Sequence, residues 1–207
     1  MISTRRNLLI AGAAGLAGAA LPRLAWADAA APAPIRSPLL GDEKAPKRLV
    51  VWGSYTCPFT AQLIGGLIGV VKDLPQIVSA EWRHFPTHLP DPALHVAGLA
   101  FTAEHFWGFT FRVLGDVYAA GGSYAGLTPA KLAAFAAAEG GSEKTLKDAY
   151  ADKAKWAAVK EDLLAGRLLG ITRTPGLFHN GYFMTPDGMP RDVKGFDKSL
   201  REMLQAG

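Results

Sequence analysis

Apolar residues change their spacing along this chain, and each spacing predicts a type of element. Residues 48–52 form a short, apolar, β-branched run that is typical of a buried strand, and residues 78–84 are predicted to form a second strand. Between them, residues 58–73 carry apolar side chains at helical spacing. The side chains on this face are Leu63, Leu67 and Val70, together with Leu74, the first residue after the predicted helix. The order strand, helix, strand predicts a parallel pair of strands with a right-handed crossover.

The middle of the chain, residues 92–169, is rich in Ala and Leu and is predicted to be mostly helical. Gly121-Gly122 and Gly140-Gly141 divide it into separate helices. Thr128-Pro129 is a good helix start, because Thr caps a helix and Pro suits its first position. We expect the aromatic residues to pack in the core or between helices, not to line a cofactor pocket. They are Phe106, Trp107, Phe109 and Phe111.

The end of the chain returns to strands. Residues 177–179 and 182–184 are apolar runs on either side of Asn180-Gly181, a strong signal for a β-hairpin. A last helix is predicted from Phe196 to Gln205, with Phe196, Leu200 and Met203 on its inner face. The complete order is β-α-β, a helical block and β-β-α, which predicts an α/β fold.

The first 27 residues have the pattern of an export signal. Arg5-Arg6 precedes a short apolar stretch, and Ala25-Trp26-Ala27 offers small residues for cleavage near Ala27. The stretch is too short, and too rich in Gly and Ala, for a transmembrane anchor. Its paired arginines are similar to those of a twin-arginine signal, and an ordinary secretory signal explains them equally well. We therefore expect a periplasmic protein, exported by either route, with no membrane anchor after cleavage.

Composition limits the function of the remaining chain. With 207 residues and 49% hydrophobic content, the sequence is sufficient for one globular domain after a flexible Ala- and Pro-rich lead-in over residues 28–38. Without the three arginines of the signal, 19 basic residues stand against 18 acidic ones. These charges are interspersed, so the sequence gives no reason to expect binding to nucleic acid.

The candidate chemistry centres on Cys57, the single cysteine of the chain. It lies where the first strand meets the first helix, in Thr56-Cys57-Pro58-Phe59-Thr60. The unpaired N–H groups at a helix N-terminus favour an anion, so this position favours the reactive thiolate. A lone thiol forms no internal disulfide, but it can attack a disulfide and hold a mixed one.

Several segments together resemble the DsbA-like family of exported thiol-disulfide oxidoreductases, which have a thioredoxin-like fold with a helical insertion. They are residues 37–46, the strand and turn of residues 51–59, Arg83-His84-Phe85-Pro86, and residues 170–175 followed by Asn180-Gly181. The resemblance covers about residues 37–205. It implies a thioredoxin domain over residues 39–207, with the helical insertion at about residues 90–169.

The resemblance also implies roles for individual residues. Cys57 corresponds to the nucleophilic cysteine of the family, and Pro58, Phe59 and Thr60 complete its motif. Thr174 and Pro175 correspond to the cis-proline segment, which in the family lies against the active-site sulfur and binds the substrate backbone. We therefore expect a cis bond before Pro175.

The sequence departs from the family pattern at two places. Thr60 replaces the second cysteine of the C-x-x-C motif, so an external thiol must resolve any mixed disulfide. One hypothesis is that the Thr60 hydroxyl, one helical turn along, donates a hydrogen bond to the Cys57 thiolate. Relatives also often carry an acidic residue near Ser54, just before the cysteine, and this chain has none there.

Histidines offer the other candidate chemistry. His84, His88 and His95 are close in sequence, but prolines interrupt the segment and no regular pair of ligands on a helix results. We therefore expect no metal site, and we expect His84 to pack at the end of its strand. Nothing places a histidine beside Cys57 for nucleophilic catalysis of the cysteine-hydrolase type.

Three functions remain open from the sequence. The first is a periplasmic oxidoreductase that acts through Cys57 on exported client proteins, with a redox partner thiol and with glutathione as a candidate co-substrate but no bound cofactor. The second is a peptide-binding module that has lost catalysis. The third is a glutathione-dependent transferase, in which Thr60 activates glutathione.

Overall fold

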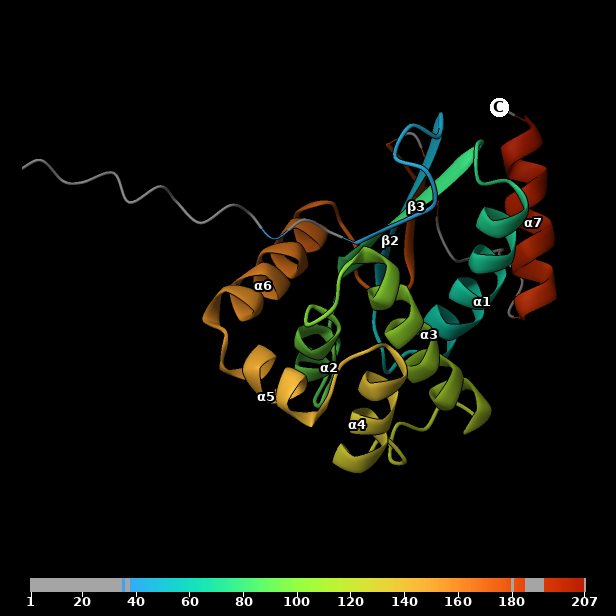
Figure 1. The fold of residues 1–207 in the computed structure, drawn as a ribbon. Helices are drawn as coiled ribbons and strands as arrows, with labels where there is room; N and C mark the ends of the chain where they lie inside the picture. The colour runs from blue at the N-terminus through green and yellow to red at the C-terminus, as the bar shows by residue number, and fades with distance from the viewer. Residues whose placement is uncertain (1–34, 36–37, 180, 185–191, 207) are drawn as a thin grey trace, which may run out of the picture. The chain divides into compact units, whose positions relative to one another are not determined.

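A five-stranded mixed sheet organises the protein. The computed structural model describes residues 35, 38–179, 181–184 and 192–206, all within one compact unit, Pro34–Gly207. The strands are β1 (Leu39–Leu40), β2 (Lys47–Gly53), β3 (Val78–His84), β4 (Gly176–His179) and β5 (Tyr182–Met184). They lie in the order β1-β3-β2-β4-β5 (Figure 1). The predicted signal, and all of the predicted lead-in except Ile35 and Pro38, lie outside the described residues.

Seven helices complete the described part of the chain. They are α1 (Pro58–Asp73), α2 (Asp91–Gly98), α3 (Ala103–Ala119), α4 (Pro129–Ala138), α5 (Glu143–Ala151), α6 (Lys153–Leu168) and α7 (Val193–Ala206). Their order with the strands is that of a thioredoxin-like fold, which confirms the predicted α/β class. Within the described parts, no helix combines the length and apolarity needed to cross a membrane.

Strand β2 is the centre of the sheet and leads directly to Cys57. It pairs in parallel with β3, as predicted from the strand, helix, strand order, and its last residue, Gly53, lies opposite His84. On its other side it pairs antiparallel with β4, where Trp52 lies opposite Gly176. The ends of β2 and β3 and the start of β4 are therefore neighbours. The edge strand β1 has only two residues, too few for a pattern that sequence reasoning could detect.

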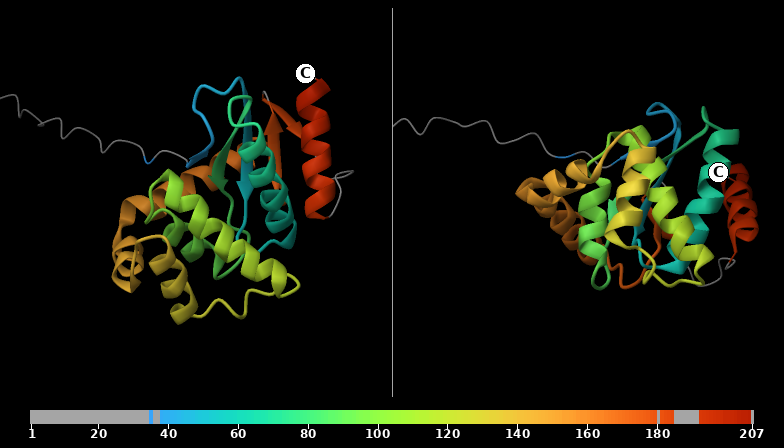
Figure 2. Two further views of the ribbon diagram at one scale, coloured as in Figure 1. Left: turned by 45° about the vertical axis from the view of Figure 1, so that its right-hand side comes forward. Right: turned by 60° about the horizontal axis from the view of Figure 1, so that its bottom comes forward.

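Helices cover both faces of the sheet (Figure 1). Leu49 and Val51 point to the face where α1 and α7 pack, and both are fully buried in the main core. Trp52 points to the opposite face, where it packs with Phe85 and Ile171 beneath α6. This alternation is the period of two of a strand buried on both sides. Figure 2 shows the helices on the two sides from further directions.

The contact between α1 and α7 depends on a glycine. A side chain at Gly66 would begin 2.9 Å from the backbone nitrogen of Asp197 and 3.0 Å from the carbonyl oxygen of Val193. The two helices can lie this close only because Gly66 has no side chain. Helix α7 begins at Val193, three residues before the predicted start, and it buries Phe196 and Leu200 as expected.

The helical block runs from α2 to α6, between β3 and β4. Thr128 caps α4 as predicted, and its hydroxyl accepts a hydrogen bond from the Lys131 N–H at 3.2 Å. Two breaks were missed, at residues 99–102 and at Asp152. Asp152 ends α5 and caps α6, where its side chain accepts from the Ala154 N–H at 2.8 Å. The glycine signals marked the other boundaries of the block.

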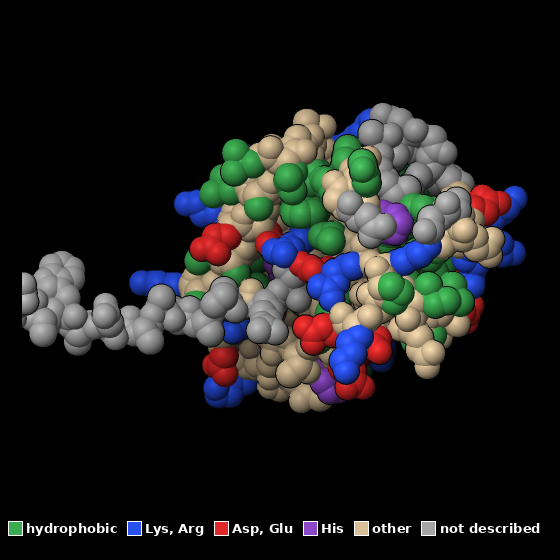
Figure 3. Space-filling view, turned by 90° about the horizontal axis from the view of Figure 1, so that it is seen from above, with side chains coloured by type: hydrophobic (Ala, Val, Ile, Leu, Met, Phe, Trp, Pro, Cys, Tyr) green, Lys and Arg blue, Asp and Glu red, His purple; other side chains and the backbone are tan. Residues whose placement is uncertain are grey.

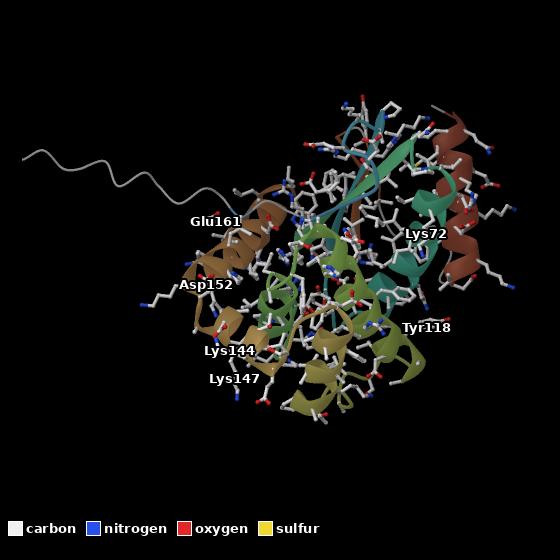
Figure 4. All side chains as sticks on the ribbon, in the orientation of Figure 1. Lys72, Tyr118, Lys144, Lys147, Asp152 and Glu161 are labelled. Atoms are coloured by element: carbon white, nitrogen blue, oxygen red, sulfur yellow. The ribbon has the colours of Figure 1, made fainter. Side chains whose placement is uncertain are left out.

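The aromatic residues of α3 divide between core and surface. Phe106 and Phe109 are fully buried, but Phe111 is 49% exposed, so the expectation of core or helix–helix packing is wrong for Phe111. Tyr118, further along the helix, is 46% exposed. Two residues correspond to about 200° around a helix, so Phe111 faces away from Phe109. Figure 4 shows Tyr118 projecting outward near the end of α3.

The predicted hairpin is present. His179 of β4 lies opposite Tyr182 of β5, and Gly181 between them has a φ of 79°, which favours glycine. Asn180 lies outside the described residues.

On the face seen from above in Figure 3, acidic and basic side chains are interspersed.

Candidate active site

Cys57 is the N-cap residue of α1. Strand β2 ends at Gly53, three residues form a turn, and the Cys57 backbone is extended, with φ −99° and ψ 117°. The turn closes with a hydrogen bond from the Cys57 N–H to the Ser54 carbonyl at 3.3 Å, and Pro58 begins the helix. The Cys57 side chain is partly exposed, as attack on a substrate requires.

The segment before β4 meets the sulfur. The Cys57 thiol lies 3.3 Å from the carbonyl oxygen of Thr174, to which it donates. The Thr174–Pro175 bond is cis, the form that the resemblance implies, and the Leu89–Pro90 bond, which sequence reasoning missed, is also cis. Thr174 and Pro175 are both buried. The structure thus brings together three predicted site residues from two distant parts of the chain.

The other residues of the motif differ in exposure. Phe59 is 38% exposed, and Pro58 is partly buried against the loop that contains Gly122. Thr60 is fully buried, and its hydroxyl oxygen accepts a hydrogen bond from the Ser54 N–H at 3.4 Å. The hydrogen bond that the structure shows for Thr60 is therefore to the turn. It differs from the hypothesis of a bond to the Cys57 sulfur.

An acidic residue that the sequence did not reveal supports the turn. Asp91, the first residue of α2, is fully buried. Its carboxylate accepts from the Ser54 hydroxyl at 2.6 Å, from the Tyr55 N–H at 2.9 Å and from the Thr87 N–H at 3.0 Å. The apparent lack of an acid near Ser54 is thus true of the sequence but not of the folded chain. The sequence signal at this position is an Asp before Pro92, and this pattern indicates only the start of a helix, not a contact with the turn.

The electrostatics of Asp91 favour its charged form. Burial by itself raises the pKa of this carboxyl. The nearby His95, together with the hydrogen bonds from Ser54 and Thr87, outweighs burial and holds the pKa below its ordinary value. A buried carboxylate therefore lies behind the turn that carries Cys57.

Two histidines lie beyond Asp91. His95 of α2 is fully buried, and its Nε2 atom is 3.4 Å from Asp91 Oδ1. His84, at the end of β3 as expected, is 2% exposed, and its Nδ1 atom is 2.8 Å from His95 Nδ1. Burial lowers the pKa of His84 well below its ordinary value, and His95 and Arg83 lower it further. His88 is exposed and bonds to the Thr87 hydroxyl at 3.0 Å. Among the described residues, no group of three or more metal-ligating side chains could hold a metal ion.

A cavity of about 410 Å³ borders the site. It lies between residues 85–87 and residues 171–172, with Arg167 also on its wall. Thr87 bonds to Ser54 at 3.2 Å, and Thr172 precedes the cis-proline segment by two residues. A larger cavity, of about 610 Å³, lies beside Arg48 and Glu81 and includes none of the residues that surround Cys57. The smaller cavity therefore lies nearer to the turn and to the cis-proline segment than the larger one, although Cys57 itself is not on its wall.

Comparisons with known proteins agree with this architecture. The chain matches the sequence profile of a family described as thioredoxin over residues 35–200. No curated protein matches it. Solved structures with a similar fold include ScsC from Proteus mirabilis, with a TM-score of 0.65, 18% identity and coverage of 84% of this chain and 74% of that chain.

Two further structures have the same TM-score. BdbD from Bacillus subtilis is 18% identical, with 82% of this chain and 93% of that chain covered. The thiol-disulfide exchange protein α-DsbA2 from Wolbachia pipientis is 16% identical, with 82% and 86% covered. At these identities the likeness concerns the fold. The profile match covers most of the chain, and together these findings show that the protein belongs to the thioredoxin family, with a DsbA-like fold.

Proposed function

We propose that this protein is an exported thiol-disulfide oxidoreductase that acts through one nucleophilic cysteine. One observation carries the proposal: the partly exposed Cys57 sulfur lies at the N-terminus of α1, 3.3 Å from the carbonyl of Thr174. An N-terminal N–H array favours the thiolate, and the cis-proline segment offers backbone groups beside it. A substrate disulfide can thus be bound next to the attacking sulfur.

The proposed reaction has two exchanges. The Cys57 thiolate attacks one sulfur of a substrate disulfide, a new S–S bond forms, and the other substrate sulfur leaves as a thiolate that takes up a proton. A second, external thiolate then attacks the mixed disulfide and releases Cys57. Electrons balance because each disulfide that breaks is replaced by one that forms.

The external thiol is required because Thr60 occupies the place of a resolving cysteine. Glutathione or a dedicated redox partner would supply it, and the substrates would be exported proteins with disulfides or glutathionylated cysteines. This arrangement suits isomerisation, reduction or deglutathionylation, and it does not suit rapid oxidation of client dithiols. No bound cofactor is needed for these steps.

The proposed location is the periplasm, after cleavage of residues 1–27 near Ala27. N-terminal sequencing of the secreted protein tests the cleavage site. Replacement of Arg5 and Arg6 by Lys tests the route, because export through the twin-arginine pathway would be lost and secretory export would continue.

The central experiment is mixed-disulfide formation with glutathione disulfide, followed by intact mass. We expect one glutathione per mature chain, removed by added reduced glutathione, and no adduct on Cys57→Ser. In Thr60→Cys, we expect the adduct to be replaced by an internal disulfide, because a resolving thiol is restored one turn away.

The same experiment separates the alternatives. If native protein forms no adduct while denatured protein does, the thiol is inaccessible to disulfides and the binding-module function is favoured. If glutathione binds without a covalent bond, and does so equally in Cys57→Ser, the transferase function is favoured. Either result would contradict the proposed oxidoreductase.

A further inference from the structure

The cavity of about 410 Å³ beside the active-site turn combines an apolar floor with a polar rim. Phe85 and Ile171 of the floor are 5% and 2% exposed. The exposed residues on its wall are Thr87, Arg167 and Thr172. A mostly apolar hollow with a few polar groups placed around it is typical of sites that bind small molecules or parts of a substrate.

Both sides of this cavity continue toward Cys57. On one side, the hydroxyl oxygens of Thr87 and Ser54 are 3.2 Å apart, and Ser54 begins the turn that ends at Cys57. On the other side, Thr172 lies two residues before Thr174, whose carbonyl oxygen is 3.3 Å from the sulfur. Two residues of chain span at most about 7 Å. A group joined to the sulfur therefore reaches the cavity with an extension of about that length.

The backbone holds Arg167 in place at the end of α6. Its neighbour Gly166 lies so close to the sheet that a side chain there would begin 2.7 Å from the Trp52 indole. The Gly166 carbonyl accepts a hydrogen bond from the Ile171 N–H at 3.0 Å. The Arg167 carbonyl accepts one from the Gly170 N–H, also at 3.0 Å. Because these carbonyls have backbone donors, the helix end does not need the Arg167 side chain as a cap.

The Arg167 guanidinium has no acidic partner within the described part of the chain. Asp162, the closest acid before it on the same helix, binds Arg83 at 3.0 Å and the His84 N–H at 2.9 Å. A guanidinium presents a planar fork of N–H donors that matches the two oxygens of a carboxylate. An arginine without an ion pair on the wall of a cavity near the reactive sulfur thus offers a site for an anionic group.

We propose that Arg167 determines specificity by binding a carboxylate of the group that exchanges its disulfide at Cys57. The inference rests on the proposed function, and it names a substrate class for that sulfur: disulfides with a carboxylate one or two residues from the attacked cysteine. The hydroxyls of Thr87 and Thr172 can donate to the same carboxylate. Glutathione has a carboxylate at this spacing on its glycine, and a client protein has one where an acidic residue lies near its cysteine.

The test compares two disulfides that differ in their carboxylates. They are glutathione disulfide and the disulfide of glutathione diethyl ester, in which both carboxylates of each half are masked. In each reaction the Cys57 thiolate displaces one half as a thiolate and keeps the other half as a mixed disulfide, whose formation is followed by intact mass. The ratio of the two rate constants is the measured quantity, because a change in the reactivity of the sulfur itself cancels in that ratio.

We expect glutathione disulfide to react faster than the ester, and we expect the ratio to fall roughly fivefold in Arg167→Gln, the effect of an exposed ion pair at its upper limit. Arg167→Lys should keep part of the preference, because it keeps the charge but loses the planar fork. Lys160→Gln is the matched control. It removes the same charge from α6 about 10 Å along the helix, and Lys160 is not on the cavity wall. Its ratio should equal that of the unsubstituted protein.

A second pair of probes distinguishes the source of the carboxylate. These probes are symmetrical disulfides of a short peptide with Glu, or with Gln, two residues from its cysteine. If Arg167→Gln lowers only the glutathione ratio, the bound carboxylate is that of glutathione. If it lowers only the ratio of the Glu peptide to the Gln peptide, the bound carboxylate is that of an acidic client. A fall in both ratios means that the cavity accepts a carboxylate from either source.

The inference is overturned if both ratios stay unchanged in Arg167→Gln, because Arg167 then serves only the dipole of α6. An equal fall in Lys160→Gln also overturns it, since the effect is then one of overall charge. Failure of Cys57 to react with any of the four disulfides contradicts the proposed function itself. Reaction with all four at equal rates contradicts the inference alone, so the two failures are distinguishable.

Discussion

Two buried aspartates hold opposite sides of the β3 end, and their environments push their pKa values in opposite directions. Asp91 binds the Thr87 N–H beyond β3, and Asp162 of α6 binds the His84 N–H at 2.9 Å. Burial raises the pKa of both. For Asp91 the partners outweigh burial and lower the pKa, whereas for Asp162 burial outweighs its partners and the pKa stays raised.

The difference lies in the basic side chain that each carboxylate faces. His95 is fully buried and has Asp91 as its single counterion within ion-pair distance. Arg83, the partner of Asp162 at 3.0 Å, has a side chain that is 37% exposed and is shared with Glu81. A partly exposed cation that two carboxylates share is screened by water, so it offsets the effect of burial on the carboxyl pKa less. The comparison teaches that the burial of the partner, as much as the number of hydrogen bonds, determines the state of a buried acid.

The strongest challenge to this comparison is Asp91→Ala. It leaves the buried His95 without the carboxylate that lies 3.4 Å from its Nε2 atom, and it removes the acceptor of two N–H groups and the Ser54 hydroxyl. We expect the free energy of unfolding to fall by about 3–5 kcal/mol, the usual cost of breaking a buried ion pair. Urea unfolding measures it, and a loss below about 1 kcal/mol would mean that the pair is not a buried ion pair.

Asp162→Ala should cost less. It deprives the His84 N–H of its acceptor, but Arg83 keeps Glu81 and contact with water. We expect a loss of about 1–3 kcal/mol, the range for an unsatisfied buried donor. The same urea titration applies. A cost equal to that of Asp91→Ala would show that exposure of the cation does not distinguish the two sites.

The pH dependence of stability should separate the two acids by sign. Because the pKa of Asp91 is lowered in the folded state, its contribution is present above the unfolded value near 3.8 and is lost as the pH falls through the folded value. Asp162 has a raised pKa, so its contribution is present below 3.8 and is lost as the pH rises through the folded value.

Asn variants reveal these contributions in urea unfolding between pH 3 and pH 7. Relative to the unsubstituted protein, Asp91→Asn should lose less stability on acidification, and Asp162→Asn should gain relative stability as the pH rises. The two differences should have opposite signs, as the directions of the two pKa changes require. Curves that move in the same direction for both variants would contradict the comparison.

The smallest expected effect is that of Thr60→Val. The substitution removes one acceptor from the Ser54 N–H but leaves the bond from the Ser54 hydroxyl to Asp91 in place. We expect a loss of about 0.5–1.5 kcal/mol in urea and no change in the alkylation midpoint of Cys57. A midpoint shifted to higher pH would instead support Thr60 as a hydrogen-bond donor to the thiolate.

Sequence reasoning succeeded where a local pattern determines the structure. The helical spacing after Cys57, the hairpin signal at Gly181 and the Thr128 cap each depend on a few neighbouring residues, and each element formed as predicted. The resemblance, more than any spacing, placed Thr174 beside the sulfur. The fold class followed from the order of the elements.

The contacts behind the turn could not be predicted in this way. Asp91 reaches Ser54 from another element, and no local spacing encodes which side of α2 faces the turn. The exposure of Phe111 was missed for a related reason, because aromatic residues two positions apart on a helix cannot share one face. Thr60 bonds to the N–H of Ser54, and this partner depends on the exact path of the turn.

The position of β2 has a consequence for biosynthesis. This central strand pairs on one side with β3, which follows soon after it, but on the other side with residues near the end of the chain. While the ribosome makes the intervening helices, the nascent chain therefore holds a strand with one edge open. Thr174, whose carbonyl oxygen accepts a hydrogen bond from the Cys57 thiol, is also made late. Until residue 174 is made, the chain thus carries its thiol without this contact, open to disulfides and other oxidants.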